Sequence, residues 1–389
     1  SYSTNELTNY FTPYQAQDNY HEKMKFTHMF NSLRLGSTDA GLLLPNRFIM
    51  APLTRCRADL DTNVPNDLMA TYYSQRASAG LIITEFTSIR QDAITFHTEA
   101  GIANDAQVDG WKKVTKAVHD NGGRIFCQIA HGGRAAHPSN NDGIVPVAPS
   151  AIALTHRTGI DFTPLGEQVE NPVPRELTDE EVKGLVGDFA AAARRAKEAG
   201  FDGVEIHAAN GYLIHQFLAE SSNKREEGPY NGKTFESRFQ FLKEIIEEIL
   251  PVFGKDRMGV RISPLNSYQD MKHDDPVEFT ADIAKRLQDY DLAYLHLMRA
   301  DFFGIQKADV ITPAREHFKN TLILNTGYTP EEGEECIEKK TFDAPVFGTL
   351  FLANPDLPKR VEVGAALNKP DSTTFYTKTA KGYTDYPFM

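Results

Sequence analysis

Strand-like runs that alternate with helical patterns constrain the fold of this chain more than any other feature. Eight short runs, apolar and rich in β-branched residues, are typical of buried strands. They lie at 47–54, 81–87, 124–131, 203–210, 258–264, 293–299, 321–327 and 344–351. This alternation predicts an α/β fold of the (β/α)8 TIM-barrel type. The alternative is a doubly wound open sheet. A dinucleotide-binding sheet of that kind would carry G-x-G-x-x-G after an early strand, and the sequence has no such motif.

Helical patterns fill the intervals between these runs, and one of them has a clear N-terminal signal. Thr178 and Glu181 form the S/T-x-x-E pattern of a capping box, which predicts a helix from there to a C-cap at Gly200. Further helices are predicted at 65–78, 106–120, 235–250, 276–288, 330–339 and 354–361, with a weaker one at 312–318.

The remaining segments complete the expected organisation. Polar residues 1–25 are expected to form a flexible extension before a single domain, 26–389. Apolar residues on both sides of Gly36 predict a hairpin that caps the barrel. Six prolines and no periodicity mark the segment between His131 and Leu177. A loop of this length after the third strand is expected to form a lid or rim over the barrel mouth, and the alternative is an insertion without a role.

The fourth run, GVEIHAANGY at 203–212, carries polar residues at a position where a buried strand ends. Strand side chains alternate, so Glu205 and His207 share one face. Asn210 and Tyr212 follow at the strand's C-terminal end, where TIM barrels place their chemistry. Taken alone, this pattern also fits a core histidine, a turn asparagine and a packing tyrosine.

Other strand ends add to this set of polar residues. Arg261 and Gln128 alternate with aliphatic neighbours and are expected to point inward. An inward arginine requires an anion or an acceptor-rich ligand, unless a structural partner such as Glu205 satisfies it. No lysine at a strand end supports a Schiff-base aldolase, and there is no G-x-S-x-G motif. A metal site stays open as an alternative, built from Glu85, His131, His207 and His296.

Charge and cysteine content exclude some classes of partner. The formal net charge is -12, so nucleic acid is not expected as a partner, because its binding depends on Lys and Arg. The three cysteines show no metal-ligand spacing, which fits free thiols in a reducing compartment. No apolar run is long enough to span a membrane, and the polar N-terminal residues do not resemble a signal peptide. A cytoplasmic protein is therefore expected.

A set of short motifs runs in order along the chain. They are MAPLTR (50–55), RASAG (76–80), GVEIHAANGY (203–212), HQFL (215–218), SNKR (222–225), GVRISP (259–264), ANPDL (353–357) and DYP (385–387). Together they resemble the old yellow enzyme family, FMN-dependent and NADPH-consuming ene-reductases on a TIM barrel, from about Phe26 to the end. The runs SSNKR, GPY and AYLH look similar to a protozoal branch of prostaglandin F synthases within it.

The resemblance implies an FMN site at the barrel mouth. Thr54 would hydrogen-bond the flavin O4, and Pro52 and Leu53 would line the ring through their backbone. Gln128 would pair with the pyrimidine edge through its amide. Arg261 would lie near N1 and O2, where a cation stabilises the negative charge of the reduced flavin.

The resemblance also implies a substrate site beside the flavin. His207 and Asn210 would hydrogen-bond a substrate carbonyl oxygen and stabilise an enolate-like transition state. Tyr212 would donate a proton to the α-carbon, and Tyr376 would line the pocket. Ala130 stands where several members of the family carry a tryptophan, so a more open pocket is expected.

The FMN phosphate is where the sequence departs most from the family. Many members carry an arginine at the position of Thr349, and here the phosphate would rest on backbone N–H groups near Gly327 and Gly348 and on the Thr349 hydroxyl. Loss of a charge-assisted bond, roughly 1.5–3 kcal/mol, predicts weaker FMN retention. Ala79, before the second strand, would let the backbone approach the flavin.

The function implied by the resemblance is an oxidoreductase with two half-reactions. NADPH would reduce FMN and leave, and an activated alkene, a quinone or a prostaglandin endoperoxide would then take its place. Two other classes stay open: a metal-dependent TIM-barrel hydrolase or isomerase, and a catalytically silent barrel that binds small molecules or a partner protein. A monomer or a homodimer is expected.

Overall fold

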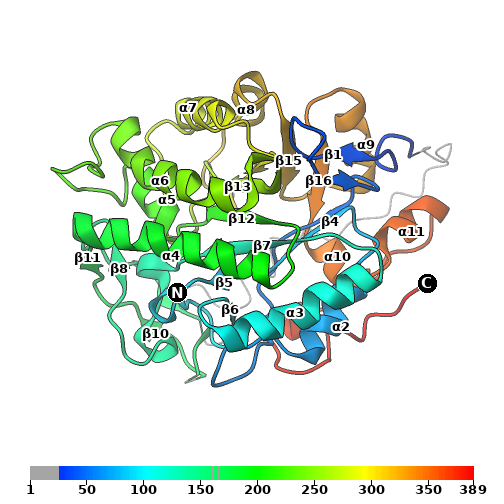
Figure 1. The fold of residues 1–389 in the computed structure, drawn as a ribbon, viewed down its shortest axis with the longest axis horizontal. Coiled ribbons are helices and arrows are strands. Elements are labelled where there is room, and N and C mark those ends of the chain that lie inside the picture. Colours follow the sequence, from blue (N-terminus) through cyan, green and yellow to red (C-terminus); the bar gives the residue numbers. More distant parts are fainter. Residues whose placement is uncertain (1–25, 160–161, 165) are drawn as a thin grey trace.

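The centre of the molecule is a closed ring of parallel strands. The computed structural model describes residues 26–159, 162–164 and 166–389. In it β12 pairs with both β7 and β13, and β16 pairs with β3, so the ring closes (Figure 1). The predicted TIM barrel is confirmed. In ring order the strands are β3 (Ile49–Met50), β4 (Leu81–Ile83), β7 (Ile125–Ala130), β12 (Gly203–Ala208), β13 (Met258–Ile262), β14 (Tyr294–Met298), β15 (Thr321–Asn325) and β16 (Ala344–Phe347).

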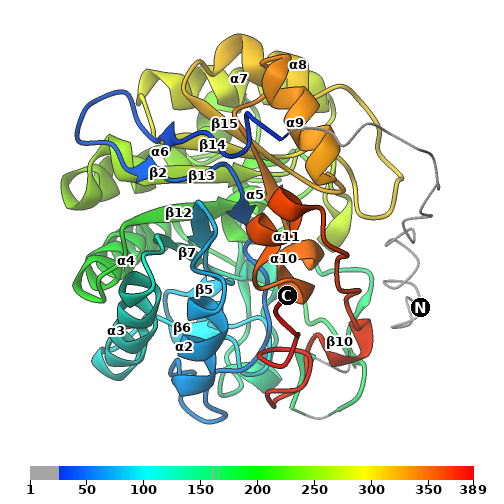
Figure 2. The same cartoon turned by 90° about the vertical axis from the view of Figure 1, so that its right-hand side faces the viewer.

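Helices surround this ring, as Figures 1 and 2 show for α3, α4, α7, α8 and α9. Their bounds are α2 (Asp67–Ser74), α3 (Asp105–Asp120), α4 (Asp179–Glu198), α5 (Leu213–Leu218), α6 (Phe235–Phe253), α7 (Pro276–Asp289), α8 (Ile311–His317), α9 (Pro330–Glu338), α10 (Thr349–Ala353) and α11 (Leu357–Val363). Short 3-10 turns lie at Gln91–Ala93, Gly133–Ala135, Pro138–Asn140, Lys255–Arg257, Tyr268–Asp270 and Ser372–Thr374. No helix in the described part of the chain combines the length and the apolar character needed to cross a membrane.

The capping box that opens α4 is confirmed. Thr178 Oγ1 accepts from the Glu181 N–H at 3.2 Å, and the Glu181 carboxylate accepts from the Thr178 N–H at 2.8 Å. The C-cap is Ala199, one residue before the predicted one, and Gly200 follows with a positive φ of +87°. That left-handed conformation is the one a glycine just after a helix adopts without strain.

The barrel interior is filled by apolar side chains at the end where the strands begin. Ile49, Leu81, Phe126, Tyr294 and Ile323 form one buried cluster there. Leu35 and Leu44 join the same cluster. They belong to the antiparallel hairpin of β1 (Leu33–Arg34) and β2 (Leu43–Leu44), so the predicted hairpin cap closes this end of the barrel.

Several short strand pairs lie at the opposite end of the barrel, which is its mouth. β5 (Thr87–Ser88) pairs with β7 and with β6 (Ala100–Gly101). In the proline-rich segment after β7, β8 (Val147–Ala148) pairs with β11 (Arg175–Glu176), and β9 (Arg157–Thr158) pairs with β10 (Val169–Glu170). Figure 2 shows the C-terminal tail, in red, beside this segment. Their contact is direct, because the Phe162 and Tyr376 rings meet at 4.8 Å. The proposed extension of residues 1–25 lies outside the described residues.

Candidate active site

Four adjacent strands place a polar layer at the barrel mouth. The register sets Glu205 beside Gln128 and sets His207, Arg261 and His296 in a row across β12, β13 and β14. Glu205 is fully buried and is the centre of the layer. Its carboxylate accepts from Gln128 Nε2 at 2.8 Å, from the Tyr294 hydroxyl at 3.0 Å and from His296 Nδ1 at 2.9 Å. These donors compensate the cost of burying the charge.

Arg261 does not form a hydrogen bond with Glu205, the structural partner considered as an alternative to a ligand. Its Nη2 donates to Asn325 Oδ1 at 3.0 Å, and its buried Nε has no hydrogen-bond partner among the described residues. Burial lowers the pKa of Arg261, since the charged form is desolvated. His207 Nδ1 and His296 Nε2 are also buried, and neither has a hydrogen-bond partner in the part of the chain that the structure describes. Buried polar atoms of this kind call for a partner outside the protein, and an acceptor-rich planar ring suits an arginine donor.

The residues that follow β12 form a tight turn. Asn210 and Gly211 both have positive φ, +57° and +75°, so the chain reverses within two residues before α5 begins. Side chains from the loop after β13 hold this turn. The Asn210 N–H donates to Ser263 Oγ at 2.8 Å, and Asn210 Oδ1 accepts from Asn266 Nδ2 at 2.8 Å. The Asn210 side chain is therefore held in one orientation beside His207.

His207 and Tyr212 form an edge-to-face pair, with ring centroids 5.1 Å apart. Burial, reinforced by the Arg261 charge, lowers the pKa of His207 well below its ordinary value, so the imidazole is neutral. Burial, reinforced by Tyr268, raises the pKa of Tyr212 well above its ordinary value. The phenol therefore keeps its proton at neutral pH. The pair combines a neutral hydrogen-bond donor with a proton donor.

Aromatic rings from separate segments enclose Tyr212. Phe86, which follows β4, meets the Tyr212 ring at 4.8 Å and the His207 ring at 5.9 Å. The ring centroids of Phe96 and Phe86 are 6.0 Å apart. Phe96 also contacts the ring of Phe162, which in turn contacts Tyr376. The wall of the pocket thus combines the loops after β4 and β7 with the C-terminal tail.

Two arginines hold the C-terminal tail in place. Arg55 donates to the backbone oxygens of Phe375 and Gly382, at 3.1 and 2.6 Å. Arg57 donates to the backbone oxygens of Phe375 and Thr374. Both arginines are almost completely buried. They lie in the loop after β3, so this loop anchors the last segment of the described chain.

The backbone where β15 and β16 end is not tightly covered by neighbouring atoms. A Cβ at Gly327 would meet only Arg299 Nη2, at 3.9 Å, and a Cβ at Gly348 would meet Leu53 at 3.5 Å and Ala51 at 3.9 Å. The short helix α10 begins just after Gly348. TIM barrels frequently bind phosphate here, between the loops after strands 7 and 8 and the start of a short extra helix.

A family model described as the NADH:flavin oxidoreductase / NADH oxidase family matches residues 28–368. The chain belongs to this family. A protein of Leishmania infantum described as a probable flavin mononucleotide-dependent alkene reductase is 50% identical over 352 residues, covering 90% of this chain and 95% of that protein. The old yellow enzyme from Trypanosoma cruzi has a similar structure, with 42% identity, a TM-score of 0.89, and coverage of 93% of this chain and 99% of that one. Morphinone reductase has 42% identity and a TM-score of 0.87, covering 94% of this chain and 98% of that one.

The resemblance to the old yellow enzyme family is therefore confirmed. The chain is an FMN-dependent oxidoreductase of the ene-reductase type. The mouth residues fit this cofactor. The unsatisfied Arg261 Nε suits its acceptor-rich ring, and the loosely covered backbone at Gly327 and Gly348 suits its phosphate.

The structure places most residues predicted for this flavin oxidoreductase at the mouth. Pro52, Leu53 and Thr54 follow β3 directly, at the same end of the barrel as Gln128 and Arg261. One Gln128 N–H is engaged by Glu205. Its amide oxygen and second N–H are what it offers to a ligand. Thr349 is the first residue of α10, beside the loosely covered backbone at Gly348.

Two expectations require correction. Ala79 precedes β4, which begins at Leu81, so it lies at the opposite end of the barrel from the mouth and cannot approach a flavin there. Ala130 is fully buried in a cluster with Phe86, Phe96 and Leu154. These side chains occupy the space that a small residue was expected to leave open. Sequence reasoning missed Phe86 and Phe96. Only the position of Phe86, directly after the strand-end Glu85, could have indicated its role.

Three of the four residues of the metal-site alternative form hydrogen bonds within the protein. Glu85 accepts from the Tyr73 hydroxyl at 3.1 Å. His131 Nδ1 accepts from the Gly133 N–H, and His296 donates to Glu205. Within the described ranges, no group of three or more His, Cys, Asp or Glu is placed to hold a metal ion. The family assignment likewise does not favour a metal-dependent hydrolase.

Proposed function

We propose that this flavin oxidoreductase reduces the carbon–carbon double bond of enones, with NADPH as the preferred source of hydride. The observation that carries this proposal is the arrangement of His207, Asn210 and Tyr212 on one strand end and its turn. FMN, when bound, accepts hydride from the nicotinamide and passes it to the β-carbon of the alkene.

The residues of the turn supply what hydride transfer to an enone requires. His207 and Asn210 donate hydrogen bonds to the carbonyl oxygen, where negative charge develops as the β-carbon is attacked. Tyr212 donates its proton to the α-carbon, and burial keeps that proton on the phenol until it is needed. The surrounding rings of Phe86 and Phe96 exclude water from this step.

Similar proteins support the enone as the substrate class. The names of relatives and neighbours include 12-oxophytodienoate reductases of Oryza sativa and morphinone reductase. We also propose quinones and prostaglandin endoperoxides as acceptors, the latter because the runs SSNKR, GPY and AYLH resemble those of prostaglandin F synthases. The same carbonyl-binding residues serve a quinone directly.

A visible spectrum and stopped-flow kinetics test the proposal. The purified protein is expected to be yellow and to bleach anaerobically with NADPH faster than with NADH. The reduced enzyme is then mixed with an enone, a quinone or an endoperoxide, and reoxidation of the flavin is followed. A colourless protein that cannot be loaded with FMN, or a reduced enzyme that no enone reoxidises, contradicts the proposal. Faster bleaching with NADH rejects only the nucleotide preference.

A further inference from the structure

Both backbone polar groups of Gly211 are held by side chains of α5. The Gly211 N–H donates to His215 Nδ1 at 3.0 Å, and the Gly211 carbonyl accepts from Gln216 Nε2 at 2.7 Å. This peptide lies between Asn210 and Tyr212, in the turn with two successive positive φ values. A non-glycine residue such as Asn210 adopts that conformation at a cost, so the turn needs restraint from its surroundings.

His215 is the first of two buried histidines in a hydrogen-bonded chain. Because His215 Nδ1 accepts from Gly211, a neutral His215 carries its proton on Nε2. That N–H points to His273 Nε2, at 3.0 Å, which must then accept. The proton of His273 is therefore on Nδ1, which donates to Glu220 at 3.3 Å. The contacts fix opposite tautomers on the two rings.

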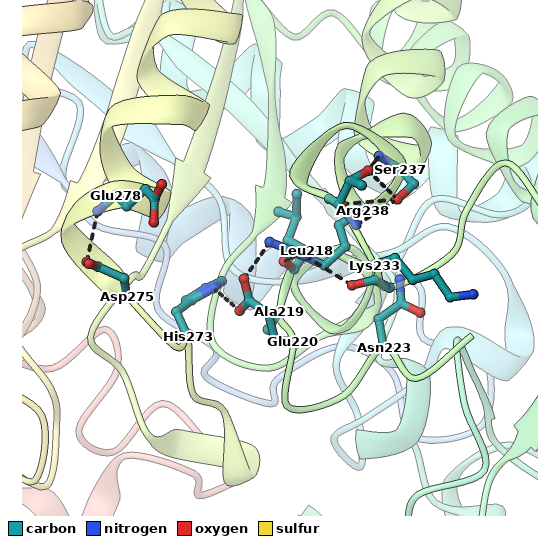
Figure 3. Close-up of polar contacts among 12 residues, drawn as sticks. Leu218, Ala219, Glu220, Asn223, Lys233, Ser237, Arg238, His273, Asp275 and Glu278 are labelled. Carbon is teal, nitrogen blue, oxygen red and sulfur yellow. Dashed lines mark hydrogen bonds and ion pairs between the residues drawn. The ribbon is translucent and has the colours of Figure 1, made fainter. Parts of the chain in front are cut away.

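The chain ends at an ion pair near the surface. Glu220 lies between His273 and Arg238, and Arg238 Nη2 pairs with Glu220 Oε1 (Figure 3). Both residues line a surface cavity of about 540 Å³. Phe279 stacks on His273, with ring centroids 3.6 Å apart, and fixes the plane of that ring. Burial lowers the pKa of both histidines, which agrees with the neutral tautomers that the chain requires.

We propose that His215 is a positioning residue, whose tautomer is set by His273 and Glu220 and which holds the Gly211 peptide so that Asn210 and Tyr212 meet the substrate. It touches neither substrate nor flavin and acts through the turn. This inference rests on the proposed function of that turn. It adds to the reaction a set of residues on α5 and in the loops after α5 and β13.

Kinetics of two His215 variants test the role. In the holoenzyme, His215→Leu removes the acceptor, and His215→Asn keeps an acceptor at shorter reach. With Leu, reoxidation of reduced flavin by an enone is expected to slow about 10–100-fold, as for a small misplacement of reacting groups. FMN affinity is expected to stay within about 2-fold, and Asn is expected to recover part of the rate. The matched control is His119→Gln. His119 lies on α3, where it pairs with Asp202, and its replacement is expected to leave the rate unchanged.

A rate for His215→Leu equal to that of the wild type overturns the proposal. So does an equal loss in both variants accompanied by loss of FMN, because that pattern indicates general disruption. If His215→Leu does not fold, His273→Phe, which leaves the Gly211 contact in place, is expected to slow the same step. A wild-type rate in that variant also overturns the proposal.

Nitrogen-15 NMR of labelled histidines gives a readout that does not depend on turnover. In wild-type holoenzyme His215 is expected as the Nε2–H tautomer and His273 as the Nδ1–H tautomer, each assigned by loss of its signal in a variant. The reverse assignment overturns the proposal. If the tautomers are as expected but the wild type reduces no enone, it is the proposed function that fails.

Discussion

The two halves of the barrel interior differ in chemistry although the same strands build both. Along β7, Phe126 belongs to the apolar cluster at the closed end and Gln128, two residues later, belongs to the polar layer at the mouth. Along β14, the Tyr294 ring belongs to the apolar cluster while its hydroxyl reaches Glu205, and His296, two residues later, lies wholly in the polar layer. Strand alternation points both members of each pair inward. A step of two residues therefore separates a layer that stabilises the fold from a layer that binds and reacts.

Replacing Tyr212 is expected to have the largest effect of these substitutions, and to change the reaction at the mouth without changing the stability of the fold. In Tyr212→Phe, reoxidation of reduced flavin by an enone should slow about 10²–10⁴-fold, the range for loss of a general acid. Flavin reduction by NADPH should be nearly unchanged, since it needs no proton from Tyr212. Stopped-flow measurement of both half-reactions checks this. Equal slowing of the two would remove Tyr212 from the role of proton donor.

The converse substitution is Phe126→Ala at the closed end. Removal of a fully buried phenylalanine is expected to lower the free energy of unfolding by about 3–5 kcal/mol. Enone turnover per FMN bound should stay close to the wild-type value. Urea unfolding and activity assays measure the two quantities, and Ile323→Val, with an expected loss of about 0.5–1.5 kcal/mol, gives the scale of a mild change in the same layer. A large fall in turnover with FMN retained would show that the layers are not separable.

Glu85 gives the mouth a dependence of stability on pH. Burial raises the pKa of Glu85 to about 7 from 4.5, so the folded state favours the protonated carboxyl. This contribution to stability is complete below pH 4.5 and is lost as the pH rises through 7, about 3 kcal/mol in all. Glu85→Gln should therefore flatten the fall in unfolding free energy between pH 5 and 8, measured with FMN in excess. Glu248→Gln, on an exposed part of α6, should leave the curve unchanged, and an unchanged curve for Glu85→Gln would refute the assignment.

Adding charge at the phosphate end is expected to have the smallest effect. Thr349→Arg places a guanidinium beside the loosely covered backbone at Gly348 and should strengthen FMN binding by roughly 1.5–3 kcal/mol, or about 10–150-fold. Thr349→Met, which adds length without charge, should not. Fluorescence titration of the apoprotein with FMN gives both dissociation constants. Equal affinities for the two variants would mean that the phosphate is held elsewhere.

The parts of the fold predicted from sequence are those with a local signal. The strands have short β-branched runs, and α4 has its capping box. Helix α5 was missed because all its residues, Leu213 to Leu218, are buried and show no apolar–polar period. The predicted helix at 354–361 corresponds to α11, which begins later, at Leu357, with Asp356 as its N-cap. Asn354 is instead the C-cap of α10, which occupies the end of the strand predicted at 344–351.

The sequence predicted which types of residue form the site, but not their hydrogen-bond partners or the loop residues that join them. Strand alternation showed that Arg261 and Glu205 both point inward. It could not show which neighbouring side chains would donate hydrogen bonds to Glu205. Phe86 and Phe96 come from loops, whose course depends on tertiary contacts and has no period to read. The prediction for Ala79 was wrong because a motif shows only the order of residues along the chain. Ala79 comes before β4, and a residue before a strand lies at the closed end of the barrel.

Arg55 and Arg57 bind the C-terminal tail by its carbonyl oxygens, which every amino acid possesses. Arg57 also contacts the side chains of Thr377 and Tyr383. The side chain of Tyr376 instead faces Phe162 in the pocket wall. Substitutions there can change the pocket wall without loosening the segment that carries it. Such a tail lets substrate preference diverge between relatives while the barrel and its cofactor site stay as they are.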